Sequence, residues 1–106
     1  MADDVMQEIE NEIRSNKVMI YMKGNPTFPQ CGFSAATIEI FEEIGRPFHT
    51  ADVLSSPVKR EAIKRYSNWP TIPQVYVNGK FVGGSDIVRE LHERGELKLI
   101  VDEAFQ

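Results

Sequence analysis

The residue best suited to chemistry in this sequence is Cys31, its only cysteine. It lies between the apolar run 18–22, which is typical of a buried strand, and a helix predicted from Phe33 onward. A thiol at a helix N-terminus has a lowered pKa, because the free N–H groups and the helix dipole favour its anion. Lys23, at the end of the predicted strand, adds a cation. The position predicts a thiolate that acts as a nucleophile or metal ligand, although an inert buried cysteine fits the placement equally well.

A single thiol limits what the chain does alone. No internal disulfide is possible, which fits a reducing compartment. Zinc and Fe–S sites normally take four ligands, and His49 and His92 form no spaced cluster with Cys31. Any metal or redox chemistry at Cys31 must therefore recruit thiols from other molecules.

A second candidate segment is Trp-Pro-Thr-Ile-Pro-Gln at residues 69–74, directly before a predicted strand. The Ile72–Pro73 bond is the best candidate in the chain for a cis peptide, since cis costs little before proline. A cis turn would leave the backbone groups of Ile72 free to bind an extended peptide. An ordinary rigid turn is the alternative.

A third candidate is the run Gly-Gly-Ser-Asp at residues 83–86, which opens a predicted helix. The N–H groups of Ser85 and Asp86 are suited to bind a carboxylate, and the Asp86 side chain to bind an amine. Simple capping of the helix by Ser85 is the alternative.

The elements that would position these residues follow from periodicity and turn signals. Asn78-Gly79 predicts a tight hairpin, since both positions of that turn need positive φ. Ser56-Pro57 predicts a capped helix start, and Gly45 a helix end. The predicted helices are 5–13, 33–44, 57–66, 85–93 and 96–105, and the predicted strands are 18–22, 48–53, 74–77 and 80–82.

This order predicts an α/β fold in a single domain spanning residues 1–106. The strand–helix–strand start requires a parallel pair, and the later hairpin an antiparallel one. The result is a mixed four-stranded sheet with helices on its faces.

Composition excludes some functions. The net charge of −4 argues against binding nucleic acid or a membrane surface, and no apolar run approaches the roughly 20 residues of a membrane span. The first residues are acidic and lack the apolar region of a signal peptide. We therefore expect the cytoplasm, although a mature organellar form would look the same.

Together, the three candidate segments resemble the monothiol glutaredoxin family of the thioredoxin fold. Cys31-Gly32-Phe33-Ser34 matches the signature of that family, where dithiol glutaredoxins carry Cys-Pro-Tyr-Cys. The loop 25–30 after Lys23-Gly24 is similar to the family's approach to its cysteine. Segments 69–74 and 83–86 match its Trp-Pro, cis-proline and Gly-Gly motifs. The resemblance covers residues 18–95 and favours a functional Cys31.

The resemblance implies that glutathione lies across these loops. Lys23 and Arg60 would bind its glycine carboxylate, the backbone of Ile72 its cysteinyl unit, and Ser85 with Asp86 its γ-glutamyl end. Arg60 lies in a charged helix run, so a merely solvated side chain is the alternative; Phe33 likewise either shapes the site or packs in the core.

The family also implies a cargo. Cys31 and one glutathione thiol from each of two chains supply the four ligands of a [2Fe–2S] cluster, so a cluster-bridged homodimer is expected. Such a cluster would pass to apo iron–sulfur proteins, and a BolA-like protein is an expected partner.

One departure from the family narrows the chemistry. Many members carry a second cysteine where this chain has Ser85, and Ser34 replaces the resolving thiol, so two-thiol disulfide reduction is excluded. The runner-up function is a glutathione-dependent thiol–disulfide oxidoreductase that acts on glutathione mixed disulfides. A redox-inert interaction module with a buried Cys31 is a third reading.

Overall fold

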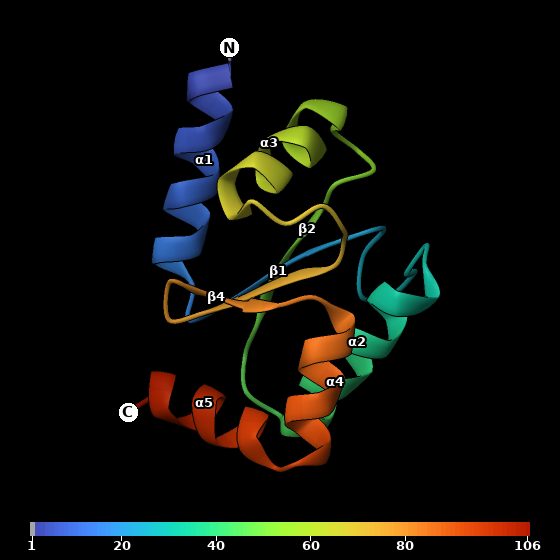
Figure 1. The fold of residues 1–106 in the computed structure, drawn as a ribbon, viewed down its shortest axis with the longest axis vertical. Coiled ribbons are helices and arrows are strands. Elements are labelled where there is room, and N and C mark those ends of the chain that lie inside the picture. Colours follow the sequence, from blue (N-terminus) through green and yellow to red (C-terminus); the bar gives the residue numbers. More distant parts are fainter. Residues whose placement is uncertain (1) are drawn as a thin grey trace.

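The chain folds as four strands and five helices in the computed structural model, which describes residues 2–106 (Figure 1). The elements in chain order are α1 (Ala2–Ser15), β1 (Val18–Met22), α2 (Gly32–Ile44), β2 (His49–Asp52), α3 (Pro57–Ser67), β3 (Gln74–Val77), β4 (Lys80–Gly83), α4 (Ser85–Glu93) and α5 (Glu96–Ala104).

The strands form one mixed sheet in the order β2-β1-β3-β4. β1 pairs in parallel with β2, where Met19 is opposite His49, and antiparallel with β3, where Met19 is opposite Tyr76. β3 and β4 form the antiparallel hairpin. The predicted mixed sheet, with one parallel pair and one hairpin, is confirmed.

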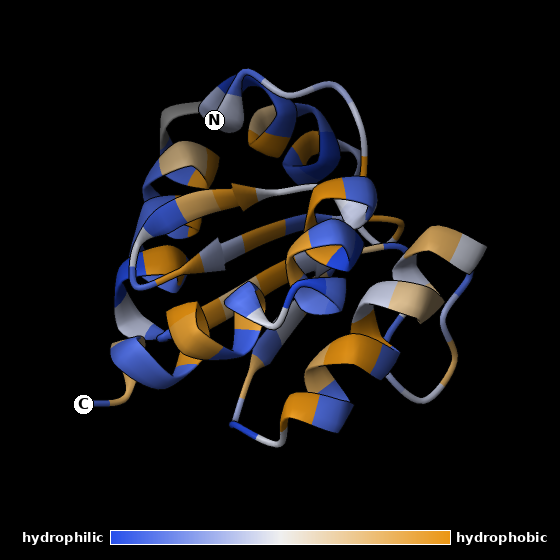
Figure 2. Cartoon of the chain, turned by 60° about the horizontal axis from the view of Figure 1, so that its bottom comes forward, coloured by the Kyte–Doolittle hydropathy of each residue, from blue (hydrophilic) through white to orange (hydrophobic). Residues whose placement is uncertain are grey.

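Helices cover both faces of the sheet (Figure 1). All five residues of β1 are buried, so its side chains alternate between two cores. Ile20 belongs to the core formed with α2, α4 and α5, and Tyr21 to the core formed with α1 and α3. Figure 2 shows helices that carry both hydrophobic and hydrophilic stretches around strands rich in hydrophobic residues, which is the pattern of a three-layer fold.

Local signals in the sequence explain the boundaries of these elements. Asn78 and Gly79 have φ of 53° and 81°, as the predicted tight turn requires. The Ser56 hydroxyl accepts from the Lys59 N–H at the start of α3, and Gly45 ends α2 in the left-handed region. The predicted elements are all present. α1 is longer at both ends than predicted, and β2 is one residue shorter at each end.

No helix within residues 2–106 combines the length and the apolar character that crossing a bilayer requires.

Candidate functional site

A groove of about 450 Å³ lies at the end of the sheet where β1 and β4 end and β3 begins. The start of α2, the face of α3 and the start of α4 complete its walls. Its lining residues are Lys23, Cys31, Phe33, Arg60, Lys64, Trp69, Pro70, Thr71, Ile72, Pro73, Gly84, Ser85, Asp86 and Ile87. All six residues that the sequence singles out for glutathione and cluster binding therefore line one groove.

Cys31 stands at the N-terminus of α2 as its N-cap residue, in an extended conformation, and its side chain is half-buried. Backbone N–H groups, first that of Ser34 and then that of Phe33, lower the pKa of the thiol, and the charge of Lys23 and the Ser34 hydroxyl contribute further. Partial burial acts against them. The thiol is accessible and its pKa is lowered. The alternative of an inert, fully buried cysteine is therefore wrong.

Ser34 has a structural part that its position in the sequence does not reveal. Its side chain is fully buried, and its Oγ accepts a hydrogen bond from the backbone N–H of Lys23 at 3.1 Å. The end of β1 is thereby fixed to the first turn of α2. This contact sets Lys23 beside Cys31 in the groove.

The loop 24–30 is closed by its own hydrogen bonds. The Asn25 side chain accepts from the N–H groups of Thr27 and Phe28, and the Gln30 N–H donates to the Lys23 carbonyl. The Gly24 N–H donates to Asp52 at the end of β2. The loop is therefore a defined structure that leads directly into Cys31.

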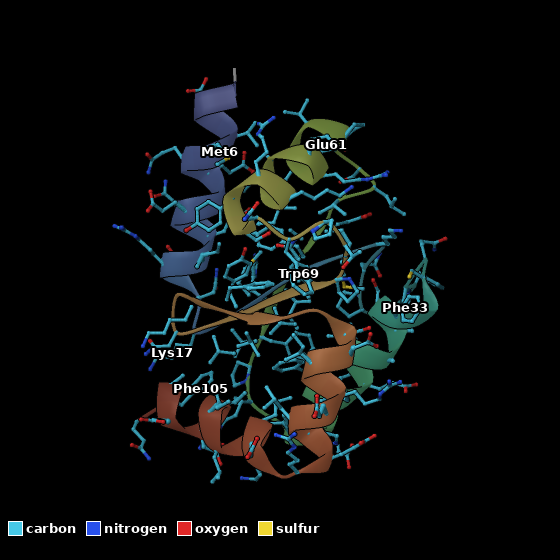
Figure 3. All side chains as sticks on the ribbon, viewed as in Figure 1. Met6, Lys17, Phe33, Glu61, Trp69 and Phe105 are labelled. Carbon is cyan, nitrogen blue, oxygen red and sulfur yellow. The ribbon has the colours of Figure 1, made fainter. Side chains whose placement is uncertain are left out.

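Two phenylalanines near Cys31 in the sequence remain exposed. Phe33 is 62% and Phe28 67% exposed. Figure 3 places Phe33 at the start of α2, away from the sheet. Phe33 therefore lines the groove and does not pack in the core.

The segment between α3 and β3 forms the floor of the groove. Its Ile72–Pro73 bond is cis, as predicted. Ile72 is 8% exposed, and within the described chain no hydrogen bond engages its backbone N–H or C=O. Its backbone is thus free to pair with an extended ligand.

The start of α4 forms another wall of the groove. The N-cap residue is Gly84, which lies against the Trp69 indole, and Ser85 is the first helical residue. The alternative in which Ser85 caps the helix is therefore wrong. In α4 the first hydrogen bond runs from the Val88 N–H to the Gly84 carbonyl, so the N–H groups of Ser85 and Asp86 have no partner inside the helix.

Charge is distributed unequally around the groove. Lys23, directly after β1, and Arg60 and Lys64 on α3 supply cations, whereas Asp86 on α4 supplies an acid. Asp86 is exposed and lies 3.6 Å from Arg89. The groove suits an extended ligand with a carboxylate facing α3 and both a carboxylate and an amine facing α4.

Sequence reasoning missed Lys64 as a lining residue. It lies four residues after Arg60, which places both side chains on the same face of α3. That spacing was available in the sequence once Arg60 had been assigned to the site.

Among the side chains that the structure describes, those of residues 4–106, no group of three or more histidine, cysteine, aspartate or glutamate side chains is placed to hold a metal ion. Cys31 offers one thiolate only.

Comparisons with known proteins agree with this geometry. The family model described as Glutaredoxin matches residues 18–82. A Synechocystis sp. protein named "Uncharacterized monothiol glutaredoxin ycf64-like" is 51% identical over 105 residues, which are 99% of this chain and 98% of that protein.

Two solved structures have the same fold. The solution structure of reduced poplar apo GrxS14 aligns with a TM-score of 0.83 at 39% identity, over 93% of this chain and 91% of that one. The crystal structure of a buckwheat glutaredoxin–glutathione complex aligns with a TM-score of 0.86 over 97% and 92%, at 23% identity, a likeness of fold.

Proposed function

Because this chain belongs to the glutaredoxin family, and within it to the monothiol class, we propose that it holds a [2Fe–2S] cluster through Cys31 and glutathione and delivers it to apo-proteins. The observation that carries the proposal is one accessible thiol of lowered pKa at the mouth of a groove shaped and charged for an extended tripeptide.

Glutathione fits the groove in one orientation. Its glycine carboxylate lies against Lys23 and Arg60, and its cysteinyl unit pairs with the backbone of Ile72. The α-carboxylate of its γ-glutamyl end meets the free N–H groups of Ser85 and Asp86, and the Asp86 carboxylate accepts from its amine. This orientation brings the glutathione thiol to Cys31.

The ligand count then favours a pair of chains. A [2Fe–2S] cluster takes four ligands, and each chain with its glutathione supplies two thiolates. Exposed Phe33, which lines the groove with Cys31, and exposed Phe28 in the loop before it provide apolar surface for a second chain. A homodimer bridged by the cluster follows, and a BolA-like protein is a second partner for the same face. Since half of the ligands belong to a small diffusible peptide, the cluster is transferable.

A second function rests on the lowered pKa of Cys31, which favours a nucleophile. The thiolate attacks the glutathione sulfur of a mixed disulfide, the substrate thiolate leaves, and Cys31 becomes bonded to glutathione. A second glutathione thiolate then attacks that glutathione sulfur, which releases oxidised glutathione and regenerates Cys31. This cycle needs no second cysteine in the chain.

Anaerobic reconstitution with ferric iron, sulfide and glutathione tests the carrier function. We expect a coloured species with the mass of two chains, read by visible absorption and size exclusion, that requires both glutathione and Cys31. Cys31→Ser abolishes it. A variant that combines Cys31→Ser with Ser15→Cys is the matched control, since it keeps one exposed thiol but places it on α1.

A colourless monomer under every condition would reject the carrier function. The oxidoreductase would then be assayed with a glutathione mixed disulfide as substrate.

A further inference from the structure

Gln74 is a polar side chain that no part of the proposed function uses, although it is fully buried at the start of β3. Its Nε2 donates to the carbonyl of Trp69 at 3.0 Å and to the carbonyl of Thr71 at 3.3 Å. Its Oε1 accepts from the Tyr76 hydroxyl at 3.2 Å. Because carbonyl oxygens only accept, this orientation of the carboxamide gives each of its polar atoms a partner.

The two carbonyls fix that orientation, and Tyr76 supplies the donor for Oε1. Burial raises the pKa of its hydroxyl far above the ordinary range, so the hydroxyl stays protonated and donates. Its ring packs edge-on against Tyr21 and Tyr66, at centroid distances of 6.0 and 6.1 Å. The donor that holds the Gln74 carboxamide is therefore itself held by the aromatic core under α3.

The contact with Thr71 has a geometric consequence for the groove. The Thr71–Ile72 peptide is a planar unit in which the carbonyl and the following N–H point in opposite directions. A Thr71 carbonyl bound inward by Gln74 therefore turns the Ile72 N–H outward, into the groove that Ile72 lines.

We infer that Gln74 is a positioning residue for ligand binding, because its carboxamide holds the peptide plane that presents the Ile72 N–H to the ligand. The inference rests on the proposed binding of glutathione in this groove. It adds the residue that orients the Thr71–Ile72 peptide in the groove floor.

The test titrates S-methylglutathione, which cannot exchange disulfides, into the reduced ¹⁵N-labelled protein. We expect Gln74→Leu to weaken binding about tenfold, since it removes the donor from the Thr71 carbonyl and frees the peptide plane. The Trp69 carbonyl keeps only a long contact, at 3.5 Å, from the Ser67 hydroxyl. We also expect the downfield shift of the Ile72 amide proton on binding to shrink. Gln7→Leu, the same change at an exposed position on α1, leaves both unchanged.

Two further measurements separate positioning from general destabilisation. The rate at which iodoacetamide alkylates Cys31 stays unchanged in Gln74→Leu, because the thiol belongs to α2. If Gln74→Leu does not fold, Tyr76→Phe replaces it as the test variant. This change keeps the ring and removes only the hydroxyl that donates to Gln74, and we expect it to weaken binding about threefold.

Equal affinity and an equal Ile72 shift in wild type and the variant that folds would overturn the inference and leave the proposed function intact. Wild-type protein that does not bind S-methylglutathione would overturn both.

Discussion

At the scale of single residues, the acidity of Cys31 comes mainly from the backbone. The N–H groups at the start of α2 contribute more than the Lys23 charge or the Ser34 hydroxyl. The backbone donors remain after any side-chain substitution that leaves α2 in place. The reactivity of this thiol is therefore built into the fold more than into its neighbouring side chains.

Alkylation of Cys31 by iodoacetamide should titrate with a midpoint below about 8.5, the pKa of a free cysteine. Ser34→Ala should raise that midpoint but keep it below the value of a free cysteine, because the backbone N–H groups remain. A midpoint in Ser34→Ala equal to that of a free thiol would show that the side chain dominates.

The same lowered pKa links stability to pH. A thiol with a depressed pKa in the folded state stabilises the fold above the unfolded pKa and loses that contribution as pH falls through the folded value. The free energy of unfolding of wild type relative to Cys31→Ser should therefore rise with pH up to about 8.5, with a slope of at most about 1.4 kcal/mol per pH unit. Chemical denaturation at a series of pH values measures it.

Arg60 and Arg65 allow a matched comparison on α3, since both are exposed but only Arg60 lines the groove. Arg60→Ala should weaken glutathione binding about five- to tenfold, through loss of a charge-assisted hydrogen bond to a carboxylate. Arg65→Ala should leave it within twofold. Calorimetric titration of both variants checks this, and equal losses would point to a general effect of net charge.

Two single-residue predictions that rest on backbone signals are confirmed: the place of Cys31 at a helix start and the cis bond before Pro73. Predictions that involve buried side chains were incomplete. Cys31 and the cis bond before Pro73 could be read from their positions next to predicted elements. The roles of Ser34 and Gln74 could not, because each contacts backbone atoms that only the folded chain brings near.

At the scale of elements, the approach to the thiol depends on one glycine. Gly24 has φ of +86°, and a Cβ there would lie 2.4 Å from the Phe28 carbonyl oxygen. Gly32, at the start of α2, has open space around the same position. Of the two glycines on either side of the loop 25–30, Gly32 thus has room for a side chain and Gly24 does not.

Gly24→Ala should destabilise the protein by about 2 kcal/mol or more, through positive φ and a clash with backbone, whereas Gly32→Ala should change stability by less than about 0.5 kcal/mol. Urea unfolding measures both. A near-neutral Gly24→Ala would mean that the loop has room to rearrange.

Which segments form helices and which form strands was predictable from periodicity and turn signals. The residues at which these elements begin and end were less predictable. The caps at Ser56 and Gly45 and the turn at Asn78-Gly79 were readable because each rests on local chemistry. The length of β2 was not, because its end is set by pairing with β1 and by the Asp52 contacts to Gly24 and Leu54.

At the scale of the whole molecule, long-range charge pairs join two helices on one face of the sheet. The Lys59 ammonium, only 13% exposed, contacts Glu8 at 2.8 Å and Glu12 at 2.7 Å and ties α3 to α1. These carboxylates raise the pKa of Lys59 against the opposing effect of burial. The sequence predicted two helices but not which charges join them, because the partners are about 50 residues apart.

The tryptophan beside Gly84 gives the molecule a native optical reporter. Trp69 is the only tryptophan in the sequence, and its indole lines the groove that also contains Cys31. Its emission therefore comes from one place, within energy-transfer range of any coloured group held at the thiol. Under the proposed carrier function, loading and release of the cluster should be seen in unlabelled protein as loss and recovery of this fluorescence, in real time and with any acceptor protein that lacks tryptophan.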